Sequence, residues 1–187
     1  MNYASIILSG QPVSGKSALA KRLSEIYKWP VHSPGQLWRD EWRRLYPSGE
    51  ISFEDFWRNT TTEDNLRMDQ RAREIFEKGG VIGDTRYSIY CTDLPALLVL
   101  ITADLDVRVQ RALGIDRYRN KSLEEVRQTL IEREKDEVRV GQSLYGIDYD
   151  YRDPKYYHLT LNSGLLTLDE EISTLVNVAP SHPPLKL

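Results

Sequence analysis

The sequence has few of the features that mark secreted, membrane-spanning or nucleic-acid-binding proteins. Cys91 is its only cysteine, so no disulfide can form within the chain, and a lone thiol is typical of a reducing compartment. No apolar run approaches the roughly 20 residues of a membrane-spanning helix, and the N-terminus has no basic segment before a hydrophobic stretch. The formal net charge is −3 and the pI about 5.7, which argues against a general affinity for DNA, RNA or anionic membranes. We therefore expect a cytoplasmic protein.

Short apolar segments alternate with helix-forming stretches over most of the 187 residues. This alternation predicts an α/β domain with a largely parallel sheet. A chain of this length can bury one substantial core, and neither an internal repeat nor a second core is evident. We expect one domain over residues 1–178, followed by a proline-rich, flexible tail over residues 179–187.

Apolar segments and helix start and stop signals together locate the secondary structure. We expect strands at residues 3–9, 29–33, 81–84, 97–101 and 159–161. We expect helices at residues 17–27, 34–45, 52–57, 62–78, 105–113, 122–140 and 169–176. In the first helix Leu19, Leu23 and Ile26 share one apolar face, and Ser122 with Glu125 has the spacing of a capping box.

Residues 10–17 have the pattern GxxxxGK[ST], placed between an apolar strand and a helix. Glycines let the backbone N–H groups of such a loop turn inward, and the following helix adds partial positive charge, so the segment is an anion site. A plain glycine turn does not require Lys and Ser together at the start of the helix. The pattern therefore predicts a nucleoside triphosphate site, with Lys16 reaching the β- and γ-phosphates and the Ser17 hydroxyl holding Mg²⁺. The residues expected around the phosphates are Gly10, Pro12, Val13, Ser14, Gly15, Lys16, Ser17 and Ala18.

Several further segments, in order along the chain, carry a resemblance to a known family. They are residues 7–23, Ser33-Pro34-Gly35-Gln36-Leu37-Trp38-Arg39, Asp69-Gln70-Arg71 followed by 80–82, then 106–111, 133–139 and 145–148. This ordered set resembles the cytidylate kinases, nucleoside monophosphate kinases in the short form of archaea and some bacteria, over about residues 3–176. The resemblance implies the three-layer α/β/α fold of P-loop NTPases, with a five-stranded parallel sheet flanked by helices. It also implies an acceptor-binding insert at about residues 33–78 and a helical lid at about residues 112–145.

Two positions depart from the pattern of that family. After the third strand the family usually has a carboxylate next to its arginine, whereas Tyr87 follows Arg86 here. In the lid, Val140 stands where the bacterial pattern has a further arginine. Both positions lie on the acceptor or lid side, so the resemblance implies a kinase but defines its acceptor less well.

The implied activity is transfer of the γ-phosphoryl group of ATP, with Mg²⁺, to a nucleoside monophosphate, CMP or dCMP being favoured. Such a transfer requires positioning and charge neutralisation, and arginine suits it because its planar fork binds two phosphate oxygens. The expected catalytic cations are Lys16, Arg86, Arg133 and Arg139, and Arg111 is expected at the donor nucleotide. Arg133 and Arg139 lie in a helix rich in acidic residues, so surface ion pairs are the alternative for both.

The acceptor candidates lie in the insert, after the third strand and in the lid. Arg39 and Arg86 are expected to grip the acceptor phosphate from opposite sides, although Arg39 has the alternative of a solvated helix position. Ser33 would support the acceptor through its hydroxyl, unless that hydroxyl only caps a helix. Asp69 is expected on the acceptor side, and the resemblance implies that Glu137 binds acceptor hydroxyls.

The remaining candidates have weaker local signals. Asp84 ends an apolar strand beside the loop, where its carboxylate would order a water on Mg²⁺; a turn aspartate is the alternative. Arg108 is expected in a structural or surface ion pair. The aromatic residues of the segment 38–57 are expected to pack against one another rather than to form a stacking platform.

Two other functions stay open. One is a kinase of the same fold with another acceptor: a different nucleotide, a nucleoside or a small hydroxyl compound. The other is a regulator whose loop only senses ATP or GTP, but a sensor does not need the arginine-rich lid segments. A GTPase is disfavoured because the sequence has no Asn-Lys-x-Asp guanine motif. We expect small-molecule nucleotide substrates, and a monomer with a dimer as the alternative.

Overall fold

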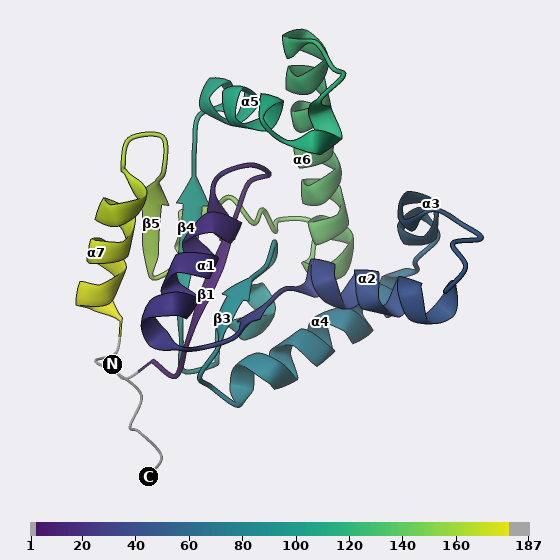
Figure 1. The fold of residues 1–187 in the computed structure, drawn as a ribbon. Coiled ribbons are helices and arrows are strands. Elements are labelled where there is room, and N and C mark those ends of the chain that lie inside the picture. The colour runs from purple at the N-terminus through teal and green to yellow at the C-terminus, as the bar shows by residue number, and fades with distance from the viewer. Residues whose placement is uncertain (1–2, 180–187) are drawn as a thin grey trace.

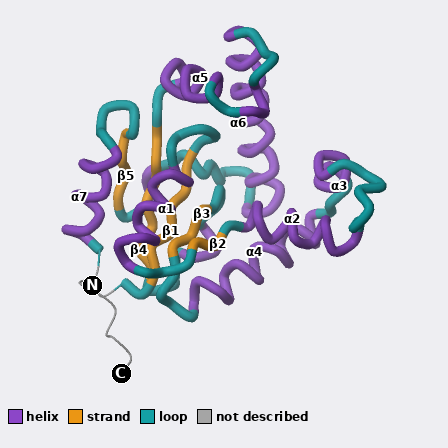
Figure 2. Tube along the Cα trace, viewed as in Figure 1, coloured by secondary structure: helices purple, strands orange, loops and turns teal. Residues whose placement is uncertain are grey.

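Five parallel strands form the centre of the computed structural model, which describes residues 3–179 (Figures 1 and 2). They are β1 (Ser5–Gly10), β2 (Val31–His32), β3 (Ile82–Asp84), β4 (Ala96–Thr102) and β5 (Leu159–Asn162). The order across the sheet is β2-β3-β1-β4-β5, and β1 pairs with β4 over its whole length, from Ser5 opposite Ala96 to Gly10 opposite Ile101. The predicted five-stranded parallel sheet is therefore confirmed.

Helices cover both faces of this sheet (Figure 1). They are α1 (Lys16–Tyr27), α2 (Pro34–Leu45), α3 (Phe53–Arg58), α4 (Thr62–Glu77), α5 (Leu105–Leu113), α6 (Leu123–Tyr145) and α7 (Leu168–Val178). Along β1 the side chains alternate between the faces: Ile6 and Leu8 pack with buried residues of α1 and α7, whereas Ile7 packs with Ala72 and Phe76 of α4. The result is the expected three-layer α/β/α arrangement.

The carboxyl ends of the strands are covered by the two helices that follow β4 in the chain. Val109 and Ala112 of α5 pack against Val126 and Leu130 of α6, and all four are fully buried. The insert of α2, α3 and α4 lies to the other side of α6 (Figure 1). The carboxyl-terminal edge of the strands, where ligands bind in open parallel sheets, thus lies between α6 and the residues of the insert that line a common cavity with it.

One local expectation, a capping box, is confirmed and two others are wrong. Ser122 and Glu125 form the predicted capping box, with the Ser122 hydroxyl and the Glu125 carboxylate each bonded to the backbone of the other residue. The apolar face of α1 is misassigned at one position, because Ile26 is 37% exposed and Tyr27 is buried in its place. The helix predicted to end near residue 140 continues to Tyr145, since the rings that surround Gly141 stabilise this stretch as helix.

Three further expectations concern the C-terminal tail, the division into domains and the membrane. Of the tail expected over residues 179–187, residues 180–187 lie outside the described part, and Ala179 is buried against the core. The division into one domain with an insert and a lid stays a prediction. Within residues 3–179 no helix has the length and apolar composition needed to cross a bilayer.

Candidate active site

The loop between β1 and α1 leaves the sheet through backbone conformations that favour glycine. Gly10 has a φ of 139°, and a Cβ there would lie 2.0 Å from the carbonyl oxygen of Ile101 on β4, so only glycine fits. Val13 (φ 62°) and Gly15 (φ 99°) also adopt positive φ values. The first N–H groups of α1 have no partner within the helix and lie next to this loop. The loop therefore has the shape and polarity of an anion site.

Lys16 is the first residue of α1, and its side chain folds back against the loop. Its Nζ donates to the carbonyl oxygens of Gly10 (2.7 Å) and Gln11 (2.9 Å). Burial lowers the pKa of Lys16 to about 8, and the charges of Arg86 and Arg133 add to this effect, while two nearby carboxylates oppose it. An arriving phosphate would raise this pKa, because it supplies negative charge where the ammonium group has little solvent.

Ser17 and Asp84 meet although 67 residues separate them, and the Ser17 hydroxyl donates to Asp84 Oδ2 at 2.6 Å. Parallel pairing of β1 with β3 places the carboxyl end of β3 beside the start of α1. A hydroxyl and a carboxylate are the hard oxygen ligands that Mg²⁺ prefers. This pair fits a magnesium site at the phosphates.

A cavity of about 910 Å³ joins the loop to the insert and to α6. Twelve of the residues expected at the site line it: Gly10, Pro12, Val13, Lys16, Ser17, Ser33, Arg39, Asp69, Asp84, Arg86, Arg133 and Glu137. The positively charged side chains that line the cavity come from the loop, the end of β3, the insert and α6. Such convergence from several directions suits two phosphate-bearing substrates.

Two of the expected arginines lie elsewhere. Arg111 lies behind the loop, where its guanidinium group donates to the carbonyl oxygens of Ser14 (3.3 Å) and Ser163 (2.6 Å). Arg139 has 79% of its side chain exposed and forms an ion pair with Asp136 at 2.9 Å. Arg139 thus forms a surface ion pair, which was the alternative to a catalytic role, and it is not one of the residues that line the cavity.

Glu137 joins the two arginines that do face the cavity. Its Oε1 pairs with the Nε atoms of Arg86 and Arg133, each at 2.9 Å, and its Oε2 accepts from the Tyr151 hydroxyl at 3.0 Å. Glu137 is only 3% exposed. The carboxylate therefore holds an arginine from the end of β3 and another from α6 at the same place.

Tyr87, which replaces a carboxylate of the family pattern, has a structural explanation. Its hydroxyl donates to the backbone carbonyl of Glu137 at 2.6 Å, and its ring packs edge-on against Tyr145, Tyr149 and Tyr151. Burial raises its pKa above the usual range, so it is neutral. Tyr87 thus attaches the segment after β3 to the C-terminal half of α6.

Asp69 faces the cavity from α4. Burial raises its pKa to about 6, a shift that the hydrogen bond from the Tyr145 hydroxyl and the charge of Arg86 oppose. Such a carboxylate changes charge near neutral pH, which is common among residues that contact substrates.

The insert contributes Ser33, Arg39 and a group of aromatic rings. Ser33 has the N-cap position of α2, but its hydroxyl makes no capping hydrogen bond and lines the cavity. Arg39 is half-buried, with its guanidinium carbon 5.3 Å from the centre of the Phe53 ring. As expected, the aromatic residues pack together, as in the edge-on pair of Trp38 and Phe56.

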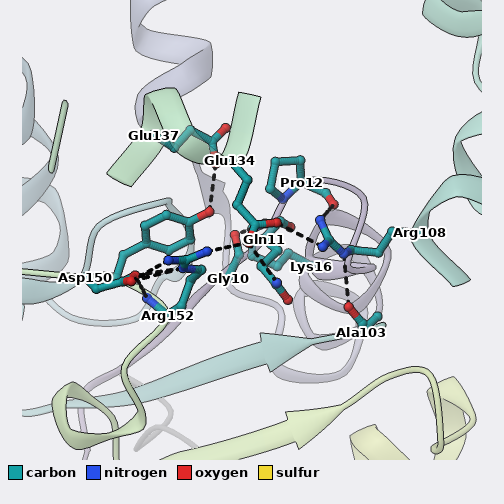
Figure 3. Close-up of polar contacts among 11 residues, drawn as sticks. Gly10, Gln11, Pro12, Lys16, Ala103, Arg108, Glu134, Glu137, Asp150 and Arg152 are labelled. Carbon is teal, nitrogen blue, oxygen red and sulfur yellow. Dashed lines mark hydrogen bonds and ion pairs between the residues drawn. The ribbon is translucent and has the colours of Figure 1, made fainter. Parts of the chain in front are cut away.

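Sequence reasoning missed five charged residues near the site, of which Glu132 and Asp136 line the cavity from α6. Arg58 and Arg117 line the cavity from α3 and from the polar segment before α6. Glu134 lies behind the loop, paired with the buried Arg108 at 2.9 Å and with Arg152 at 2.7 Å (Figure 3). The one signal for Glu134 was its spacing of three residues from Glu137, which puts both on one side of a helix.

The fold and the loop define a P-loop kinase, a class that uses a nucleoside triphosphate as phosphoryl donor. The model of the cytidylate kinase-like family matches residues 36–165, and the chain belongs to that family. The cytidylate kinase of Methanopyrus kandleri is 30% identical, over 91% of this chain and 90% of its own. The cytidylate kinase of Desulfurococcus amylolyticus is also 30% identical, over 92% and 91%.

Solved structures agree at the level of the fold. A shikimate kinase from Bacteroides thetaiotaomicron superposes with a TM-score of 0.62 at 15% identity, covering 94% of this chain and 97% of its own. An uncharacterised protein from Eubacterium ventriosum gives 0.66 at 16% identity, covering 93% and 96%. These structures confirm the fold, and the family match with the two cytidylate kinases confirms the resemblance inferred from the sequence.

Proposed function

We propose that the protein transfers the γ-phosphoryl group of ATP to a nucleoside monophosphate, with CMP or dCMP as the preferred acceptors. The observation that carries this proposal is the meeting of Lys16, Arg86 and Arg133 at one cavity that also contains the Ser17–Asp84 pair. The names of the relatives support the choice of cytidine nucleotides. A cytoplasmic location and a monomeric state, with a dimer as the alternative, stay predictions.

On the donor side, the loop of residues 10–17 and the N-terminus of α1, including Ala18, bind the triphosphate. Lys16 neutralises the β- and γ-phosphates, and Ser17 with Asp84 holds Mg²⁺, directly and through water respectively. The metal ion, when bound, offsets charge on the transferring group. Arg111 supports the loop from behind through Ser14.

On the acceptor side, Arg39 and Arg86 approach the acceptor phosphate from the insert and from the end of β3. Ser33 and Asp69 complete the insert wall of the cavity. Glu137 either contacts acceptor hydroxyls or keeps Arg86 and Arg133 in place; its three side-chain partners favour the second role. A catalytic role for Arg139 requires it to leave Asp136 and turn toward the cavity.

A second candidate is a kinase of this fold with a different acceptor. The observation that favours it is Tyr87, since the acceptor side has a buried neutral ring where the family pattern has a carboxylate. Phe53 and Trp57 also line the cavity, and their rings give the acceptor side an apolar surface beside its charged residues.

A coupled assay for ADP release tests the proposal, using Mg-ATP with CMP, dCMP, UMP, AMP, GMP and dTMP. We expect turnover with CMP or dCMP to exceed the others by at least tenfold. Lys16→Ala should abolish transfer, whereas Lys21→Ala, an exposed position on the same helix, should leave it unchanged. ATP binding without turnover on any of these nucleotides would favour the second candidate, and full activity of Lys16→Ala would refute the assignment of the loop.

A further inference from the structure

Two carboxylates of α6, three residues apart, have different surroundings. Glu137 faces the cavity, but Glu134 does not line it, and the Glu134 side chain is 12% exposed on the side of α6 that meets the back of the phosphate loop (Figure 3). Burial opposes ionisation, yet the hydrogen bond from Arg152 and the charge of Arg108 hold the pKa of Glu134 below its usual value. Glu134 is therefore a nearly buried, charged group.

The first partner of Glu134 is Arg108 of α5, which is only 3% exposed. The guanidinium group is bound on three sides: Nη2 pairs with Glu134 Oε2 at 2.9 Å, Nε donates to the Ala103 carbonyl at 3.0 Å, and Nη1 donates to the Pro12 carbonyl at 3.4 Å. Among the described residues, Glu134 supplies the one carboxylate that pairs with Arg108. The charge of Arg108, which contacts the loop at Pro12, is thus balanced from α6.

The second partner is Gln11, within the loop itself. Its side-chain amide donates to Glu134 Oε1 at 3.3 Å, and its backbone carbonyl accepts from Lys16 Nζ at 2.9 Å. One residue of the loop is therefore bound at its side chain by α6 and at its backbone by the lysine that meets the phosphates.

The third partner, Arg152, fixes this arrangement from the segment after α6. It pairs with Glu134 Oε1 at 2.7 Å and with Asp150 Oδ2 at 2.6 Å. Glu134 consequently joins four parts of the chain: the phosphate loop, α5, α6 and the segment before β5.

We propose that Glu134 is a positioning residue, which holds the phosphate loop in its binding shape through Arg108 and Gln11. Neutralising Glu134 leaves Arg108 buried without a counter-charge, and a buried unpaired charge is unstable enough to force a rearrangement. Because Arg108 and Gln11 both contact the loop, the rearrangement alters the loop and the placement of Lys16. The identity of the ligand rests on the proposed function, whereas the effect on the loop does not.

The same contacts divide the predicted lid. From Glu134 onward α6 is bonded to the loop and to the segment that contains Asp150, so this half belongs to the fixed frame of the site.

Hydrogen exchange of the ligand-free protein tests the effect on the loop directly. The variant is Glu134→Gln, and the matched control on the same helix is Glu124→Gln, whose carboxylate is 80% exposed with its arginine partner at 3.8 Å. We expect exchange in a peptide covering residues 9–18 to be at least tenfold faster in Glu134→Gln, with a peptide from α7 unchanged in both variants. Unchanged exchange of the loop would overturn the proposal. If Glu134→Gln does not fold, Glu134→Asp, which withdraws the charge by one methylene, is measured by the same criterion.

Ligand binding gives a readout that general destabilisation does not produce. Calorimetric titration with Mg-ATP should give a Kd at least tenfold higher for Glu134→Gln than for the wild type, while the Kd for CMP stays within twofold. The double variant Arg108→Gln/Glu134→Gln should bind Mg-ATP no more weakly than Glu134→Gln, because both substitutions break the same ion pair between Arg108 and Glu134. Equal losses for both nucleotides, or additive losses in the double variant, would contradict the role of Glu134. Absence of Mg-ATP binding by the wild type would instead refute the proposed function, and the exchange experiment would still decide the effect of Glu134 on the loop.

Discussion

Replacement of Lys16 by methionine tests the electrostatics of the phosphate loop independently of catalysis. Methionine has similar length but no charge. Burial is the main reason that the pKa of Lys16 falls from 10.5 to about 8 in the folded protein. In the unfolded chain a lysine titrates near its ordinary pKa of about 10.4. As the pH rises, the folded protein therefore loses this proton before the unfolded chain does.

The sign and size of the effect follow from this difference. Below pH 8 the lysine is charged in both states, and the folded state bears the full cost of the buried charge, about 3 kcal/mol as an upper bound because Lys16 is partly exposed. Between pH 8 and 10.5 the unfolded state binds more protons, so the stability of the wild type rises with pH. From pH 7 to pH 10 the wild type should gain about 2 kcal/mol relative to Lys16→Met.

Urea unfolding of both proteins at pH 7, 8, 9 and 10, followed by circular dichroism, measures this gain. The difference between the two proteins removes the contribution of other titrating groups, and the hydrogen bonds lost with Lys16 contribute a constant. Lys21→Met, at an exposed position of α1, is the control for replacing a lysine of this helix by methionine. A difference between wild type and Lys16→Met that stays constant from pH 7 to pH 10 would refute the reasoning.

Two further substitutions test the packing and the charge balance of α6. Gly141→Ala places a Cβ 3.1 Å from atoms of two buried tyrosine rings. Overpacking should exceed the gain in helix propensity and lower the free energy of unfolding by about 1 kcal/mol, measured by thermal unfolding. The control is Gly114→Ala, whose Cβ would meet only ordinary contacts and should change the free energy of unfolding by less than about 0.5 kcal/mol. Glu137→Gln leaves two arginines without their shared carboxylate and should cost about 3 kcal/mol in urea unfolding. Asp136→Asn breaks only the exposed pair with Arg139, so a loss as large as that of Glu137→Gln would show that burial is not the cause.

Features encoded within a few neighbouring residues could be predicted from the sequence. The loop of residues 10–17 has its glycines, lysine and serine in one run, and the capping box of Ser122 and Glu125 spans three residues. The placement of Asp84 beside the loop also followed, because parallel strands bring their carboxyl ends to one edge. In each case a local pattern, or the simple geometry of a sheet, determines the contact.

Features that depend on tertiary partners could not be predicted. Glu132 and Glu134 are alike in an acidic helix, and only the position of Glu134 relative to α5 decides that it is nearly buried while Glu132 is exposed. The end of α6 was missed for the same reason, since Gly141 reads as a weak helix residue until the rings of Tyr87 and Tyr149 are placed around it.

The strand order has a consequence for how the molecule forms. The central strand β1 comes first in the chain, yet its neighbours are β3, which ends at Asp84, and β4, which ends at Thr102. Pairings of such long sequence separation require large loops to close, so they form late and slowly. During synthesis, residues 5–10 leave the ribosome before either neighbouring strand and acquire both neighbours only after residue 102 has followed. Since Gly10 packs on Ile101 and Gln11 bonds to Glu134, the phosphate loop takes its final shape only after both Ile101 and Glu134 have followed, and nucleotide binding by a growing chain would report that stage.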